Sequence, residues 1–113
     1  MRLRLIGVLT LVFAASVQAA TPAGPNRIVA GSFADPDHTQ VQDAAVRRAS
    51  AAVARCGLEP FNDFSGKFVG FSEEFDVVVV GGYATRAAAE ADRARLRPCV
   101  PTAYIRRGRY AGE

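Results

Sequence analysis

The same short pattern occurs twice in this sequence, about fifty residues apart. The first copy is IVAGSFADPDH from Ile28, and the second is VVVVGGYATRAAAEADRARL from Val77. Each copy starts with an apolar, β-branched run typical of a strand, continues with glycine and an aromatic residue, and leads into a helix signal. Because residues 29–33 and 79–83 align in the same order, the chain is predicted to contain two related halves.

The first half is predicted to form a strand, a helix and a second strand. Residues 27–33 form the first strand. Asp35 and Asp37 flank a proline, and this combination of capping oxygen, proline and negative charge favours a helix start. Apolar residues then recur at helical spacing up to Gly57, a natural helix stop. In residues 59–71, phenylalanines recur beside glycines, so we expect a bent strand, or a strand and a turn.

The second half repeats this order. Residues 75–80 contain four consecutive valines and are predicted to form a central strand. Thr85 caps an alanine-rich helix over residues 86–97, which Pro98 ends. Residues 100–107 alternate as a last strand.

Two short βαβ units of this kind cannot each bury an apolar face alone. Interleaving their strands gives one four-stranded antiparallel sheet with both helices on one face. This is the ferredoxin-like split βαβ arrangement (βαββαβ) of the α+β class. The other face of the sheet is predicted to be open.

The first 19 residues have the features of a secretory signal. Two arginines precede an apolar stretch, and small residues ending at Ala19 follow it. A membrane anchor is the alternative, but the apolar stretch is shorter than the roughly 18 to 20 residues that cross a bilayer. We therefore expect residues 1–19 to be a signal peptide, 20–26 a flexible lead-in, 27–108 one domain and 109–113 a solvated tail, in a periplasmic or secreted protein.

The net charge of the chain argues against a nucleic-acid partner. Loss of the two arginines in the signal would lower the formal net charge from +3 to +1, whereas a nucleic-acid-binding domain would keep a strong basic excess. We expect no nucleic acid partner and no stable membrane insertion after signal cleavage. The arginines at positions 106, 107 and 109 are interpreted as solubilising rather than as a binding site for an anionic surface.

Few residues are suited to catalysis or metal binding. Ser32 lacks the Gly-x-Ser-x-Gly elbow of a serine hydrolase, and the chain has one histidine, His38. His38 follows Asp35 and Asp37, but a helix cap and an exposed histidine explain this cluster better than a metal site, which normally draws on distant ligands as well. We predict no enzyme activity, no cofactor and no metal.

Two motifs are similar to those of a known family. Gly31-Ser32-Phe33 after an extended run, and GGYATRAAAEADRARL in the second half, resemble the SPOR domain, in which V-Q-V-G-S-F and V-G-P-F-x-T-R-x-x-A-x-x-x-x-x-x-L are typical. The resemblance covers about residues 27–108. It implies an exported, non-catalytic βαββαβ module that binds peptidoglycan, favouring glycan strands without stem peptides, on the open sheet face.

Strand parity then assigns the open face to Arg27, Val29, Phe33, Val77, Val79, Thr102, Tyr104 and Arg106. The residues predicted to face the helices are Ile28, Ala30, Val78, Val80, Ala103 and Ile105.

The glycan-binding residues that the resemblance implies combine aromatic contacts to sugar rings with arginine donors. They are Arg27, Val29, Phe33, Val79, Tyr83, Tyr104 and Arg106.

The resemblance is incomplete at two positions. Val29 stands where the family has a glutamine, and Val79 where a polar residue is frequent, so two polar contacts are missing. The alternative function is therefore a protein-interaction or homodimerisation module that docks through this apolar face. Tyr104 and Arg106 fit a ligand site and a solvated, aggregation-resistant edge equally well.

Cys56 and Cys99 follow the two predicted helices, and the sequence leaves their pairing open. An oxidising compartment favours a disulfide, which would stabilise the fold by roughly 4 kcal/mol. Antiparallel helices, however, would place the two cysteines at opposite sheet edges, beyond the roughly 7 Å between Cα atoms that a disulfide allows. Pairing would then indicate an error in the topology or in the end of the second helix.

Overall fold

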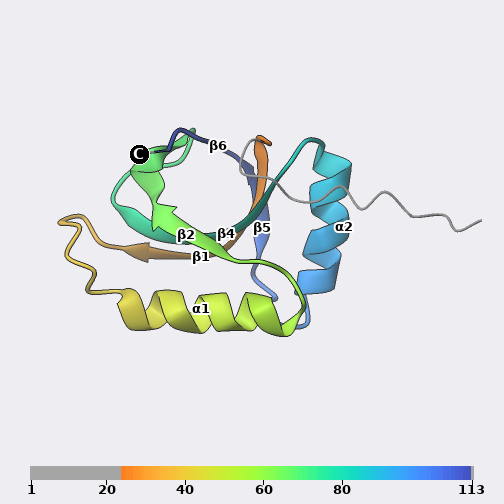
Figure 1. The fold of residues 1–113 in the computed structure, drawn as a ribbon, viewed down its shortest axis with the longest axis horizontal. Helices are drawn as coiled ribbons and strands as arrows, with labels where there is room; N and C mark the ends of the chain where they lie inside the picture. The colour runs from red at the N-terminus through yellow and green to blue at the C-terminus, as the bar shows by residue number, and fades with distance from the viewer. Residues whose placement is uncertain (1–23, 113) are drawn as a thin grey trace, which may run out of the picture.

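Four antiparallel strands form the main sheet of the protein, in the order β2-β4-β1-β5 (Figure 1). The computed structural model describes residues 24–112, so the predicted signal peptide lies outside the described residues. Strands β3 and β6 form a second, two-stranded sheet. The elements are β1 (Asn26–Ala34), α1 (Asp43–Arg55), β2 (Phe61–Phe64), the short helix η1 (Ser65–Lys67), β3 (Phe68–Val69), β4 (Phe75–Tyr83), α2 (Arg86–Leu96), β5 (Tyr104–Arg107) and β6 (Arg109–Tyr110).

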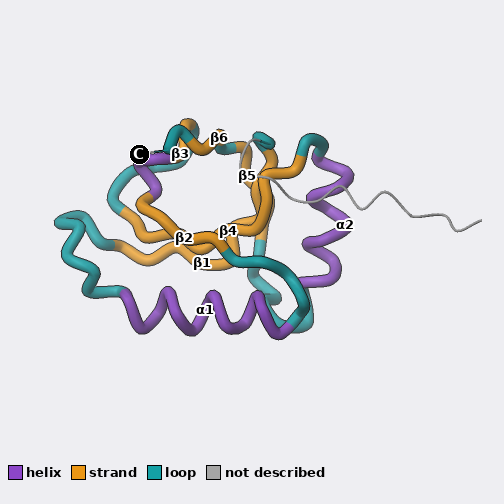
Figure 2. The backbone as a smooth tube through the Cα atoms, viewed as in Figure 1, coloured by secondary structure: helices purple, strands orange, loops and turns teal. Residues whose placement is uncertain are grey.

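The predicted ferredoxin-like split βαβ fold is confirmed. Strands of the two halves alternate across the sheet, and both helices pack on the same face of it (Figure 2). Val46 and Val53 of α1 share one apolar core with Ala89 and Leu96 of α2. The residues predicted to face the helices all lie in or against this core: Ile28, Ala30, Val78, Val80, Ala103 and Ile105.

The two helix starts differ in how well the sequence predicted them. Thr85 caps α2 as expected, since its hydroxyl accepts a hydrogen bond from a backbone N–H of the first turn. Helix α1 begins only at Asp43, so a start directly after Asp35 is wrong. The Asp35 carboxylate instead accepts the backbone N–H groups of Thr39 (3.0 Å) and Gln40 (3.1 Å) and thereby holds the loop that precedes the helix.

Each half carries a β-bulge beside its glycine. In β1 the register shifts between Val29 and Gly31, which makes Ala30 an extra residue. In β4 the corresponding shift lies at Gly81 and the glycine that follows it. A bulge interrupts the alternation of side chains along a strand, so strand parity fails beyond both glycines.

Phe33 and Tyr83 consequently face the helices, which corrects their assignment to a glycan-binding face. Phe33 packs against the helix-side core, and the Tyr83 hydroxyl donates to Asp92 of α2. Each ring lies over the glycine two residues before it: an added Cβ would be 2.9 Å from the Phe33 ring at Gly31, and 2.6 Å from the Tyr83 ring at Gly81. The repeated glycine and aromatic residue are therefore one packing unit used twice.

The opposite face of the sheet is covered, which corrects the prediction of an open face. Phe68 of β3 packs with three buried valines of the sheet, at positions 29, 77 and 79, in a second apolar cluster. Further aromatic residues surround this cluster: Phe61, Phe71, Phe75 and Tyr110. Phe68 and Phe71, from the segment between β2 and β4, thus form a cover over the sheet.

The C-terminal residues complete this cover, so the predicted solvated tail is wrong for its first part. Strand β6 pairs with β3, placing Tyr110 opposite Phe68. The Tyr110 hydroxyl donates to Asp63 of β2 (2.7 Å), and the backbone N–H of Ala111 donates to the carbonyl of Lys67 (2.8 Å). The strand pairing, the Tyr110 ring and these two hydrogen bonds together tie this segment to the domain.

Cys56 and Cys99 form a disulfide, with 6.1 Å between their Cα atoms. This bond corrects the expectation that the topology keeps the two cysteines apart, although the topology itself is as predicted. Helices α1 and α2 lie at a wide angle to each other in Figure 1, and their C-terminal ends lie close together. The twist and curvature of the sheet turn the helices away from an antiparallel arrangement, and this brings the two cysteines together.

Candidate functional site

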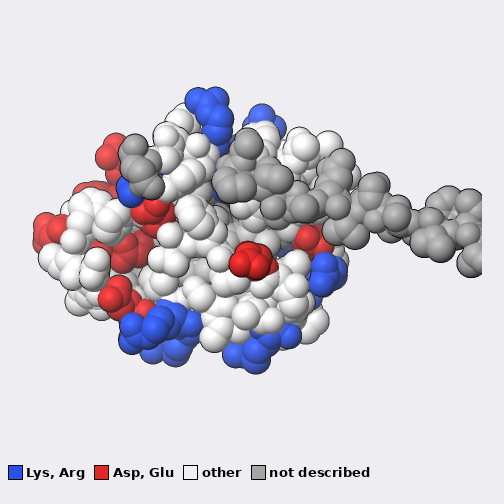
Figure 3. Space-filling model, viewed as in Figure 1, with Lys and Arg blue, Asp and Glu red and all other residues white. Residues whose placement is uncertain are grey.

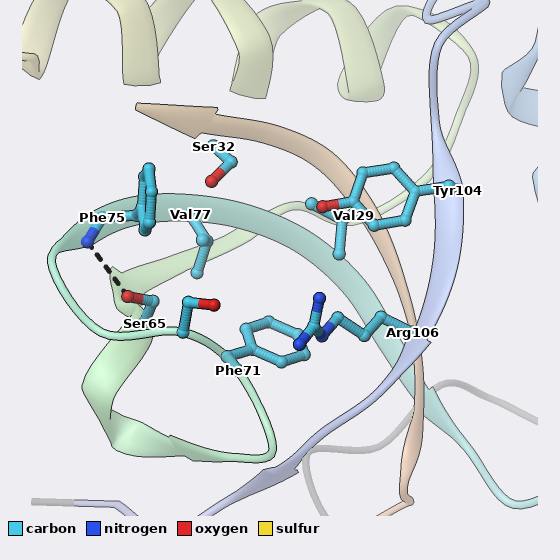
Figure 4. A pocket seen from close by; sticks show the side chains of 9 residues that line it. Val29, Ser32, Ser65, Phe71, Phe75, Val77, Tyr104 and Arg106 are labelled. Carbon is cyan, nitrogen blue, oxygen red and sulfur yellow. Dashed lines mark hydrogen bonds between the residues drawn. The ribbon is translucent and has the colours of Figure 1, made fainter. Parts of the chain in front are cut away.

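A hollow of about 170 Å³ remains on the covered face of the sheet, and we call it the outer hollow (Figure 4). Val29 and Val77 of the sheet form its floor, and side chains of β5 and of the segment after β3 form its walls. The residues that line it are Val29, Ser32, Ser65, Phe71, Ser72, Phe75, Val77, Tyr104 and Arg106.

The walls of the outer hollow are aromatic. Tyr104 is 46% exposed and stands beside Val29, its partner in the β1–β5 ladder. Phe71 lies opposite it, with the Arg106 guanidinium 5.6 Å from the centroid of the Phe71 ring (Figure 4). Arg106 also donates to the carbonyl of Gly70 (2.9 Å), so its position at the rim is held by both a cation–π contact and a hydrogen bond.

Three serines add polar groups to this lining. The Ser65 hydroxyl is buried and accepts the backbone N–H of Phe75 (3.0 Å), so it serves the structure. Ser32 and Ser72 are exposed, and Figure 4 shows the Ser32 side chain on the side of β1 that borders the hollow. The outer hollow therefore combines aromatic surfaces, an apolar floor and a few hydrogen-bonding groups.

Of the seven predicted glycan-binding residues, Val29, Tyr104 and Arg106 line the outer hollow. The others do not reach it: Val79 is fully buried beneath the cover, and Phe33 and Tyr83 face the helices. Thr102 of the predicted open face lies in the turn before β5. Sequence reasoning missed Phe71, Phe75 and the serines, although the recurring phenylalanines signalled an aromatic cluster.

Arg27 is also withdrawn from the surface. Its side chain is fully buried, donates to the carbonyls of Gly81 (2.8 Å) and Gly108, and lies 5.2 Å from the Phe68 ring centroid. Burial lowers the pKa of the Arg27 guanidinium. Because it connects β1, β4 and the cover, Arg27 has a structural role.

A pair of carboxyl groups lies at the other end of β1 and β4. Asp35 is 1% exposed and Asp76 is 9% exposed, and their side chains share a hydrogen bond. Backbone N–H donors, foremost that of Thr39, lower the pKa of Asp35, whereas burial and then the Asp35 carboxylate raise the pKa of Asp76 to about 6. Asp35 is therefore the ionised member of the pair, and Asp76 is the one that takes up a proton as the pH falls to about 6.

Asp76 of this pair borders a second hollow of about 180 Å³ between α1 and β2. Acidic side chains gather around this end of the molecule in Figure 3, while basic ones lie mainly elsewhere. The two carboxyl groups influence each other's pKa directly, whereas the carboxyl groups of a glycosidase pair stand about 5 Å or more apart. The lining residues are Gln40, Asp43, Val46, Asn62, Asp63, Phe64 and Asp76.

Residues 24–112, which the structure describes, contain neither a metal-binding cluster nor a membrane-spanning helix. No cluster of three or more histidine, cysteine, aspartate or glutamate side chains there could hold a metal ion. No helix in the same part of the chain has the length and apolar character needed to cross a membrane.

Comparisons with models of protein families, with curated proteins and with solved structures find no match for this chain. The relation to the SPOR domain family therefore stays a prediction that depends on the two motifs.

Proposed function

We propose that the protein is a non-catalytic glycan-binding module and that its site is the outer hollow. The observation that supports this most is the lining: Tyr104, Phe71 and Phe75 surround an apolar floor, and Arg106 and two exposed serines stand at the rim. Sugars present apolar C–H faces that pack on aromatic rings, and hydroxyl groups that need donors and acceptors. The outer hollow offers both kinds of contact.

The size of the outer hollow suits a single sugar unit of a longer chain. Its volume of about 170 Å³ is smaller than the roughly 300 Å³ or more of pockets that enclose a drug-sized ligand. One ring would enter, and the neighbouring rings would lie along the exposed surface.

Peptidoglycan is the glycan that we propose. The predicted signal peptide would export the protein, and the resemblance to the SPOR domain implies binding to glycan strands without stem peptides. The site is smaller than the resemblance implied, because the aromatic cover occupies the rest of the sheet face.

The alternative function, docking of a protein or a second copy through Val29 and Val79, loses its main support. Both valines are buried beneath Phe68. An apolar docking face would require this cover to leave the sheet.

A sedimentation assay tests the proposal. The mature protein would be mixed with isolated murein sacculi, with and without amidase treatment that removes the stem peptides. We expect the protein to pellet with sacculi, and the pelleted fraction to rise after amidase treatment. Absence of wild-type protein from both pellets would contradict the proposal.

Two variants locate the site. Tyr104→Ala removes the exposed ring of the outer hollow and should weaken sacculus binding about tenfold with little change in thermal stability. Val41→Ala is the matched control, because Val41 is 72% exposed and does not line the hollow. Equal binding of the two variants would show that the glycan binds elsewhere.

A further inference from the structure

Part of the β1 edge beside the outer hollow has no neighbouring strand. On one side β1 pairs with β4 along its whole length, but on the other side β5 pairs with it only from Asn26 to Val29. Residues 30–34 therefore present one edge that no described strand occupies. The Ser32 side chain, on this part of β1, lines the outer hollow.

The alternation of hydrogen-bonded residues along β1 shows which backbone groups point to this edge. The backbone N–H of Asp35 donates to the carbonyl of Glu74 (2.8 Å), in the same register that places Ser32 opposite Val77 and Ala34 opposite Phe75. In an antiparallel ladder the residues that bond to the partner strand alternate with residues that point away from it. The N–H and C=O groups of Ser32 and Ala34 thus point away from β4.

Most groups along this edge already have a partner. Val29 pairs with Tyr104 of β5, and the carbonyl of Ala34 accepts a hydrogen bond from the Gln42 side chain (2.9 Å). Between them, the N–H and C=O of Ser32 have no hydrogen-bond partner among the described residues, and Ser32 is exposed. The open part of the edge therefore offers three backbone groups: the N–H and C=O of Ser32 and the N–H of Ala34.

We propose that this edge binds the acetamido group of an N-acetylated hexosamine. An acetamido group carries one N–H and one C=O, the same pair that a strand residue presents, so it can complete the ladder at Ser32. The inference rests on the proposed function, since the sugar ring of the same unit would pack against Tyr104 in the outer hollow. The ligand class is accordingly an N-acetylhexosamine glycan and not a plain glucan.

The short length of this edge favours an acetamido group over a peptide strand. A strand that extended the sheet would need several consecutive backbone pairs. Tyr104 blocks the edge on one side of Ser32, and the Gln42 side chain occupies it on the other. A single amide group fits between them, whereas a peptide or the same edge of a second copy would have to displace one of the two.

Two oligosaccharides with the same β-1,4 backbone test the proposal. Chitotetraose carries acetamido groups at the positions where cellotetraose carries hydroxyl groups. In calorimetric titrations of the mature protein we expect chitotetraose to bind at least tenfold more tightly. In NMR titrations the Ser32 amide signal should shift with chitotetraose and stay in place with cellotetraose. Equal affinities, or an unmoved Ser32 amide signal in the chitotetraose complex, would overturn the proposal.

A substitution at Ser32 separates backbone from side-chain recognition. Ser32→Pro removes the N–H that points to the open edge, a position where a strand tolerates proline, and should weaken chitotetraose binding about tenfold. Ser32→Ala keeps the backbone N–H and removes only the hydroxyl at the rim of the outer hollow, so it should weaken chitotetraose binding clearly less than Ser32→Pro does. If Ser32→Pro folds and binds like Ser32→Ala, the edge is not the acetamido site; if it fails to fold, the NMR titration of the wild type decides.

The outcomes distinguish this inference from the proposed function. If both oligosaccharides bind equally and Tyr104→Ala weakens both, the outer hollow is a glycan site but the acetamido site is wrong. If neither oligosaccharide nor sacculi bind, the proposed function itself fails. Binding of unrelated extended peptides that shifts the Ser32 signal would assign the edge to strand pairing instead.

Discussion

Replacement of Asp76 by asparagine should make the protein more stable at neutral pH. Asp76 holds the proton that it shares with Asp35, and its pKa is raised to about 6, first by burial and then by the Asp35 carboxylate. Above this pH the folded protein must hold two charged carboxyl groups side by side. The introduced amide would still donate to Asp35 but would never ionise, so Asp76→Asn removes the repulsion and keeps the hydrogen bond.

The magnitude follows from the pKa of Asp76 in the folded and unfolded chain. A rise from 3.8 to about 6 corresponds to about 3 kcal/mol. Because the raised pKa favours the protonated, folded form, this stability is present below pH 4 and is lost as the pH rises from about 4 through 6. Asp76 also lines a hollow that solvent reaches, so we expect roughly half of this value, about 1.5 kcal/mol.

Urea unfolding at pH 4, 6 and 7.5, followed by circular dichroism, measures the effect. Wild type and Asp76→Asn should have similar free energies of unfolding at pH 4, and the variant should be about 1.5 kcal/mol more stable at pH 7.5. The control is Asp37→Asn, which removes an exposed carboxylate close in sequence to Asp35; its difference from wild type should change little with pH. A difference for Asp76→Asn that is constant with pH, or a loss of stability at pH 7.5, would refute the shared proton.

Two further predictions concern the framework. Replacement of both Cys56 and Cys99 by alanine should lower the free energy of unfolding by about 4 kcal/mol, the chain-entropy value for a separation of 43 residues; a loss below about 1 kcal/mol in urea unfolding would show that the bond contributes little. Gly31→Ala should lower the free energy of unfolding by about 1 to 3 kcal/mol, because the added methyl group would crowd the Phe33 ring. Gly81→Ala should lower the free energy of unfolding by about 1 to 2 kcal/mol more than Gly31→Ala, because Gly81 also has a φ of 105°. Equal losses for the two variants would show that the backbone at Gly81 accepts a side chain.

The sequence predicted the fold because the features that determine it are local. Four valines in a row, the Thr85 cap and the alanine-rich faces each specify one element, and the repeat specifies how the halves interleave. The disulfide could not be predicted in the same way. Whether Cys56 and Cys99 come together depends on how far the sheet twists. No local sequence pattern predicts the angle between the two helices that results.

The site was only partly predictable, for two physical reasons. Strand parity correctly placed Val29, Tyr104 and Arg106 on the outer face. The bulges beside Gly31 and Gly81 turn Phe33 and Tyr83 to the helix side instead. The cover was missed because its phenylalanines recur at threes and fours, as in a helix, while Gly66 and Gly70 argue against a helix, so no regular element with a defined buried face was predicted. Such a segment indicates burial, but its sequence does not indicate which surface it covers.

The two faces of the sheet have different origins in the sequence. On the helix side, the repeated glycine and aromatic residue of each half pack in the same way, so duplication explains the core. On the outer side, Phe68, Phe71 and Tyr110 come from the connection between the halves and from the C-terminal strand, which have no counterpart in the repeat. The outer hollow lies where these unrepeated segments leave part of the sheet uncovered. In the proposed glycan site, Phe71 therefore comes from a segment that the duplication does not constrain, whereas Ser32 and Tyr104 lie on strands of the two halves.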